Sequence, residues 1–287
     1  MPDGIVVIDK PAGWTSMDVC AKVRGILHEK RVGHSGTLDP MATGVLPVFV
    51  GQATKAVSFA EGGQKTYEAV LRLGVETDTQ DVTGTVLRTC PVTVGEDEVR
   101  AALPRFTGEL LQLPPMYSAL KVNGQKLYDI ARRGGTVERK PRAITVYALE
   151  LLARLSETDY ALRVVCSKGT YVRTLCSDIG ALLGCGGAMA ALRRTEAAGF
   201  ALSEAVTIEE VQERGASVLR AVDSLFRAYP AYTIPDAEQE RRCRCGNPLR
   251  AALPDGLYRV YAQDGSFLTL SEAAGGVLTA RRNFFSV

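Results

Sequence analysis

The segment GHSGTLDPMATGVLP, Gly33 to Pro47, decides how the rest of the chain is interpreted. Proline lacks a backbone donor and glycine is costly to order, so a segment rich in both cannot continue one regular element through its middle. Pro40 disfavours helical dihedrals at the residue before it, which places Asp39 at a turn. The sequence therefore predicts a shaped loop.

This loop carries one carboxylate, Asp39, and one histidine, His34. Loops held on a rigid scaffold carry a disproportionate share of binding and catalytic residues, so both side chains are candidates for a functional site. Most Asp-Pro turns are only turns, however, and composition alone leaves the structural interpretation of Asp39 open.

Length and composition indicate a water-soluble globular protein. With 287 residues, 46% hydrophobic and 23% charged, the chain can form one large domain and a small second one. It has no apolar run of 18 residues, and its start does not resemble a signal peptide, so we expect a cytoplasmic protein that spans no membrane. Seven cysteines without framework spacing indicate reduced thiols, and Cys243 and Cys245 have no second pair of ligands nearby, so no metal site is predicted.

Positive charge is concentrated between Leu120 and Thr145, where seven lysines and arginines face two acids, a balance of +5 on a chain whose net charge is +2. Such a segment suits contact with a phosphate backbone, and it equally suits a solvated surface loop.

Residue periodicity predicts both strands and helices. In the strand from Thr66 to Gly74, alternate residues from Tyr67 to Leu73 share one buried face. Ser16 is the predicted cap of the first helix, and Thr207 with Glu210 forms a capping box. Further strands are expected at 4–9, 45–50, 144–155 and 160–166, further helices near 95–106, 125–133 and 171–183, and hairpins at Asn123-Gly124 and Asp264-Gly265.

Six other segments along the chain are informative, one before the loop and five after it. They are DKPAGWTS (9–16), KTYEA (65–69), TDTQDVTG (77–84), PPMYSALKVNGQKLYDIAR (114–132), KGTYVRTL (168–175) and ALRRTEAAG (191–199). With the loop, this series resembles the motifs of the TruB family of pseudouridine synthases over about Gly4 to Gly199.

The resemblance implies an enzyme that converts uridine 55 in the T loop of tRNA to pseudouridine. The base is flipped out, an aspartate-dependent step breaks the glycosidic bond, and the uracil is rejoined through C5. The expected partner is the tRNA T stem-loop, no cofactor is needed, and a monomer is expected. The chain agrees in having neither a G-x-G-x-x-G nor a G-x-x-x-x-G-K motif.

The resemblance also assigns residues. Asp39 is expected to be catalytic and Arg173 to pair with it, while His34 occupies the space that the flipped base leaves. The residues expected around the flipped base are Tyr67, Tyr171 and Leu192, and those expected to support the site are Lys10 and Arg193.

The implied fold class is α+β, with a catalytic domain (residues 1–228) on a mixed, mainly antiparallel sheet with flanking helices. Residues 229–287 are expected to form a small all-β, PUA-like RNA-binding domain. Two other functions stay open: a protein that binds or folds the T loop without turnover, and the same isomerisation on another RNA. The motifs leave open whether Asp39 attacks C1′, attacks C6 or removes a ribose proton.

Overall fold

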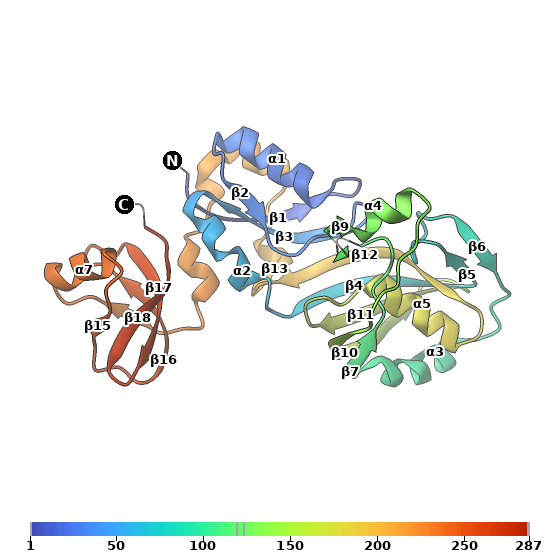
Figure 1. The fold of residues 1–287 in the computed structure, drawn as a ribbon. Coiled ribbons are helices and arrows are strands. Elements are labelled where there is room, and N and C mark those ends of the chain that lie inside the picture. The colour runs from blue at the N-terminus through green and yellow to red at the C-terminus, as the bar shows by residue number, and fades with distance from the viewer. Residues whose placement is uncertain (1, 119, 123, 286–287) are drawn as a thin grey trace.

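The computed structural model describes residues 2–118, 120–122 and 124–285, and its main body is a nine-stranded mixed sheet with helices packed on it (Figure 1). The strand order is β1-β3-β12-β4-β11-β10-β7, with β2 beside β3 and β13 beside β12. Only the β3–β12 pair is parallel among these. The strands are β1 (Gly4–Lys10), β2 (Val32–His34), β3 (Thr43–Val50), β4 (Lys65–Leu73), β7 (Gly108–Gln112), β10 (Arg142–Arg154), β11 (Asp159–Cys166), β12 (Gly187–Ala197) and β13 (Phe200–Ala201).

The helices of this body are short, and two small hairpins project from it. No helix in the described part of the chain is long and apolar enough to cross a membrane. The helices are α1 (Ser16–Leu27), α2 (Val57–Ala60), α3 (Glu96–Ala102), α4 (Leu127–Arg132), α5 (Val172–Leu182) and α6 (Ile208–Arg214), and the hairpins are β5 (Val75–Thr77) with β6 (Val86–Thr89) and β8 (Lys121–Val122) with β9 (Gln125–Lys126).

Most predicted elements are confirmed. Tyr67, Ala69, Leu71 and Leu73 are all buried along β4, as the alternation predicts. The capping box of Thr207 opens α6, and α5 occupies the expected place. The helix predicted at 125–133 starts later, because residues 125–126 pair with β8, while Asn123 of the predicted turn lies outside the described residues.

The predicted cap of α1 is wrong by one residue. Thr15 has extended dihedrals, so its side chain accepts a hydrogen bond from the Asp18 backbone, and the Asp18 carboxylate accepts from the Thr15 backbone in return. Ser16 is instead the first helical residue and is buried. Its hydroxyl bonds both the N–H and the C=O of Leu38, which fixes the chain next to Asp39.

A second, smaller sheet follows, with the order β14-β16-β17-β18-β15 and one short helix, α7 (Ala237–Arg244). The predicted α+β class is confirmed, and this unit is β-rich as expected. Figure 1 shows it (orange to red) at the side of the molecule where the N-terminus lies. The strands are β14 (Ala231–Thr233), β15 (Leu249–Arg250), β16 (Gly256–Tyr261), β17 (Phe267–Ala274) and β18 (Val277–Asn283).

The two units share buried apolar side chains. Phe49 of β3 belongs to the same cluster as Phe226, Leu270 and Phe284. The rings of Phe226 and Phe284 lie 5.7 Å apart. A domain boundary between residues 228 and 229 therefore stays a prediction, since apolar packing crosses it.

Gly44 shows how tightly the main sheet is packed at the parallel pair. Its φ is +100°, and a Cβ there would lie 2.2 Å from the Arg194 carbonyl oxygen. We expect Gly44→Ala to lower the free energy of unfolding by at least about 2 kcal/mol, through backbone strain and displacement of β12. Gly25→Ala is the matched control: this exposed α1 position has open space, so the change should stabilise by about 0.5–1 kcal/mol. Urea denaturation measures both, and equal stabilities for the two variants would contradict the packing.

Candidate active site

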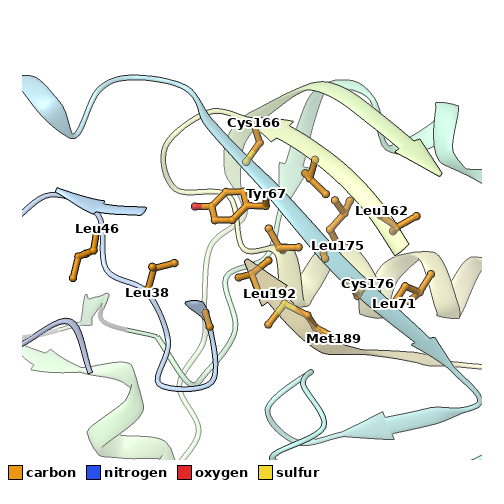
Figure 2. Packing of buried hydrophobic residues seen from close by; sticks show 14 of the residues in the cluster. Leu38, Leu46, Tyr67, Leu71, Leu162, Cys166, Leu175, Cys176, Met189 and Leu192 are labelled. Carbon is orange, nitrogen blue, oxygen red and sulfur yellow. The ribbon is translucent and has the colours of Figure 1, made fainter. Parts of the chain in front are cut away.

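A cavity of about 560 Å³ opens beside the loop that follows β2. It is lined by side chains from this loop, from β4, from the approach to α5 and from β12. Figure 2 shows the Tyr67 ring with its hydroxyl end toward the side where Leu38 lies, and Leu192 nearby. The predicted residues that line the cavity are His34, Asp39, Tyr67, Tyr171, Arg173 and Leu192, whereas Lys10 and Arg193 do not line it.

The loop lies outside the sheet because β3 pairs along one edge with two different strands, and a gap separates the two pairings. β2 pairs with residues 48–50 of β3, and β12 pairs with Thr43 and Gly44. Between them the Ser35 N–H donates to the Pro47 carbonyl over 3.1 Å. The backbone N and O of one strand residue point to the same side of the strand. The nitrogen of Pro47, which has no hydrogen to donate, therefore points toward the loop, where no neighbouring strand needs a donor. The break in pairing therefore leaves residues 35–42 outside the sheet, and residues 36–39 of this segment line the cavity.

Asp39 and Arg173 form an ion pair at the cavity wall. Arg173 Nε lies 2.9 Å from Asp39 Oδ2, and Nη2 lies 3.4 Å from Oδ1. The arginine side chain is 6% exposed and the aspartate 36%, so the pair has one face open to the cavity. Arg173 lies in the first turn of α5, where the helix dipole disfavours a cation, and the carboxylate offsets that repulsion.

Two further segments hold the Arg173 guanidinium. Nη1 donates to the Thr79 carbonyl (3.1 Å) and Nη2 to the Tyr117 carbonyl (2.9 Å). Asp81, itself buried, lies 3.7 Å from Nη1. The TDTQDVTG segment, to which no site residue was assigned, thus fixes the partner of Asp39.

Charged neighbours act in opposite directions on Asp39. The pKa of its carboxyl is raised overall: burial raises it most, the Arg173 guanidinium lowers it, the Asp81 carboxylate raises it, and the Lys10 ammonium lowers it. Removal of the guanidinium would leave only Lys10 to favour the ionised form. Arg173 is therefore the main group that keeps a partly buried Asp39 charged.

The aromatic and apolar walls are also held in place. The Gln112 side chain accepts from the Tyr171 N–H (2.8 Å) and donates to the Tyr171 carbonyl (3.0 Å), which fixes the backbone just before α5. Tyr67 and Leu192 are 7% and 8% exposed, respectively. They belong to the adjacent strands β4 and β12, so the cavity has a rigid floor on this side.

His34 ends β2 at the cavity. Its Nδ1 is buried without a hydrogen-bond partner among the described residues. Burial lowers the pKa of the imidazole, and the Arg194 guanidinium lowers it further. His34 is therefore neutral near pH 7, and none of the described residues bonds its Nδ1.

The two predicted supporting residues lie behind the cavity. Lys10 is fully buried and donates to the carbonyls of Pro11, Trp14 and Pro40, which ties β1 to the residue after Asp39. Burial lowers the pKa of this ammonium to about 8. Arg193 pairs with Asp9 (2.7 Å) and bonds Thr43, so it joins β12 to β1 and β3.

Comparison with known proteins identifies the family. The family model for the N-terminal domain of the TruB family of pseudouridylate synthases matches residues 24–172, and the model for the tRNA pseudouridylate synthase B C-terminal domain matches residues 173–225. The chain belongs to the TruB family. It is thus a pseudouridine synthase, an isomerase. The junction of the two matched segments falls in the first turn of α5, so the cavity of this synthase takes residues from both.

Individual relatives agree with this. A tRNA pseudouridine synthase B of Ralstonia pickettii is 44% identical over 297 residues, covering 97% of this chain and 93% of the relative. One of Ectopseudomonas mendocina is 45% identical over 295 residues, covering 99% and 96%. Among solved structures, a Cbf5-Nop10-Gar1 complex contains a chain with a TM-score of 0.73 and 26% identity, covering 99% of this synthase and 85% of that chain.

Arg194 is a cavity residue of this synthase that was not predicted. Arg194 is fully buried and lines the cavity beside Tyr67, whereas its neighbour Arg193 faces away from it. The signal was the period of two in a strand: if Leu192 faces the cavity, residue 194 faces it as well. Among the described residues, no group of three or more His, Cys, Asp or Glu side chains could hold a metal ion.

Replacement of Arg173 should change both the pH profile and the stability of this synthase. Because the guanidinium lowers the pKa of Asp39, Arg173→Gln raises that pKa, and the acid limb of kcat/KM moves to higher pH. The free energy of unfolding should fall by about 3 kcal/mol, since one partner of a largely buried ion pair is lost.

Arg173→Lys keeps the charge and should shift the acid limb less than Arg173→Gln. Pseudouridine formation measured across the acid range tests the shift, and denaturation tests the stability. An acid limb at the same pH in wild type and Arg173→Gln would show that ionisation of Asp39 does not depend on this pair.

Proposed function

We propose that the protein isomerises uridine 55 in the T loop of tRNA to pseudouridine, with the target base flipped into the cavity and Asp39 as the catalytic carboxylate. The observation that carries this proposal is the Asp39–Arg173 pair, whose carboxylate is partly exposed and lines a cavity. The cavity volume of about 560 Å³ is in the range that small ligands occupy.

The tRNA substrate is supported by the curated relatives, which are named for it and match nearly the whole chain. Exposed cations at the cavity support an RNA ligand: Arg142, from the basic segment, and Lys168 both line it. Other members of the basic segment have protein partners, since Arg139 donates to the Pro114 carbonyl and Arg132 lies 5.2 Å from the Tyr128 ring. Arg142 and Lys168 are thus the phosphate contacts we propose first.

A stacked base reaches such a cavity only by leaving the RNA helix, at a cost of a few kcal/mol of unstacking. Tyr67 and Tyr171 offer ring surfaces to the extruded uracil, and Leu192 offers an apolar one. His34 lies at the cavity next to the loop, where a neutral imidazole can take the place of the base within the RNA.

The chemistry requires an ionised Asp39. A carboxylate can attack C1′, attack C6 or remove a ribose proton, and each of these steps uses its negative charge. Arg173 supplies the paired hydrogen bonds that keep and orient this charge. Lys10 and Arg193 support the loop and strand that carry the reacting groups.

The remaining parts of the proposal concern context. We propose that residues 1–228 catalyse, that residues 229–287 form a PUA-like unit that contacts RNA, and that the protein is a cytoplasmic monomer. The seven cysteines are free thiols, which suits a reducing compartment.

The main alternative is a protein that grips the T loop without turnover. Binding alone gains nothing from a carboxylate that faces a polyanionic ligand, so the open face of Asp39 favours an enzyme. Isomerisation of another RNA is the second alternative, and product mapping separates it from the proposal.

The decisive measurement is tritium release from an unmodified tRNA transcript labelled at uracil C5. Wild type should release tritium, with pseudouridine mapped to the T-loop uridine, and Asp39→Asn should lose at least about 1,000-fold in rate because the ionised group is gone. Asp97→Asn is the matched control, since Asp97 is exposed in the first turn of α3 and does not line the cavity.

Three results would contradict parts of the proposal. Tight binding without release by wild type would favour the binding protein. Pseudouridine mapped only to another site or another RNA would refute the T-loop assignment, and full turnover by Asp39→Asn would refute the catalytic residue.

A further inference from the structure

Arg194 is a buried charge without a carboxylate partner. Its side chain is fully buried in β12, and none of the ion pairs among the described residues includes it. Removing a guanidinium from water is costly unless its donors and its charge are satisfied. The residue therefore needs an account beyond packing.

Two of its donors join the strand to the catalytic loop. Nε donates to the Val45 carbonyl (2.7 Å) and Nη2 to the Gly36 carbonyl (2.9 Å). These carbonyls lie on either side of Asp39 in the chain, in β3 and at the start of the loop. Arg194 thus fixes both ends of the segment that presents the carboxylate.

Its third nitrogen is free among the described residues. Nη1 is buried without a hydrogen-bond partner, and a Cβ on Gly36 would lie 3.4 Å from it. Gly36 and Arg194 both line the cavity, so this nitrogen lies at the cavity wall.

Arg194 is also the direct partner of Tyr67 across the β12–β4 pair. Directly opposed residues of an antiparallel pair share one face of the sheet and lie about 4.5–5.5 Å apart at Cβ. Burial raises the pKa of the Tyr67 phenol, and the Arg194 guanidinium is the largest influence that lowers it. Arg194 is thus placed to stabilise negative charge on the phenol oxygen.

We propose that Arg194 is a positioning residue that holds the catalytic loop and stabilises the Tyr67 phenolate while Tyr67 carries a proton from uracil C5 to N1. This inference rests on the proposed function and adds to it a proton transfer by Tyr67 and the residue that supports that transfer.

The step balances without a further reactant. When the N1–C1′ bond breaks, the phenol gives its proton to N1 and becomes a phenolate beside the guanidinium. The uracil then turns so that C5 takes the place that N1 held, and the C5–C1′ bond forms. The phenolate takes the proton that C5 must lose, which restores the phenol and completes the isomerisation.

The test uses full-length protein and tRNA transcripts that carry either hydrogen or deuterium at uracil C5. Arg194→Gln should lower kcat by about 100-fold or more, the size of a general acid–base contribution, with KM for tRNA changed less than threefold. The ratio of rates with the two labels should rise above that of wild type, because proton removal from C5 becomes slower.

Two comparisons separate this role from a merely structural one. If Arg194 stabilises the Tyr67 phenolate, Arg194→Gln should cost much less activity in the Tyr67→Phe background than in wild type, and the loss that remains there measures its hold on the loop. Arg193→Gln is the matched control: it removes the neighbouring arginine, lowers stability, and should leave the isotope ratio as in wild type.

The conservative variant keeps the proposal testable if Arg194→Gln does not fold. Arg194→Lys retains the charge, so Tyr67→Phe should still cost activity in that background but less than in wild type. Multiplicative losses in the double variants, together with an unchanged isotope ratio, would overturn the proposal. A wild-type protein that releases no tritium would instead refute the proposed function itself.

Discussion

The site depends on one ion pair, which keeps the Asp39 carboxylate charged although protein surrounds it. Asp39 is presented by an irregular loop, and Arg173 reaches it from the first turn of a helix more than a hundred residues later. The guanidinium is held in turn by the carbonyls of Thr79 and Tyr117. Four segments that are distant in sequence must therefore come together to keep Asp39 charged and oriented. The large sheet is what brings these segments together.

The loop itself depends on an interruption in the sheet. On one side, β3 pairs first with β12 and then with β2, and between these two pairings it has no partner strand. Pro47 lies in this gap, where its lack of a backbone donor leaves no strand hydrogen bond unmade. Lys10, Ser16 and Arg194 each bond backbone groups of the loop or of the adjoining strand. Side chains from β1, α1 and β12 thus hold the backbone of this irregular segment in place.

Local sequence was sufficient to predict the loop and the inward direction of one site residue. Pro40 and the surrounding glycines predicted the loop, and alternation along β4 predicted the inward direction of Tyr67. The error at Thr15 and Ser16 arose because both residue types cap helices well, and only the tertiary fold decides which one is extended. Arg194 was not predicted because the family resemblance assigns roles only to its neighbours Leu192 and Arg193. The carbonyl partners of Arg173 have no sequence signal, since every residue has a carbonyl.

The apolar cluster shared by the two sheets also has a consequence for how the molecule meets a large ligand. Phe226 contacts rings from β17 and from Phe284, and it belongs to the same cluster as Phe49 in the main sheet. Packed interiors resist small displacements, so the two sheets are coupled as one rigid object. Packing therefore fixes the distance between the loop that carries Asp39 and the second sheet, and a ligand long enough to reach both would have to match that distance.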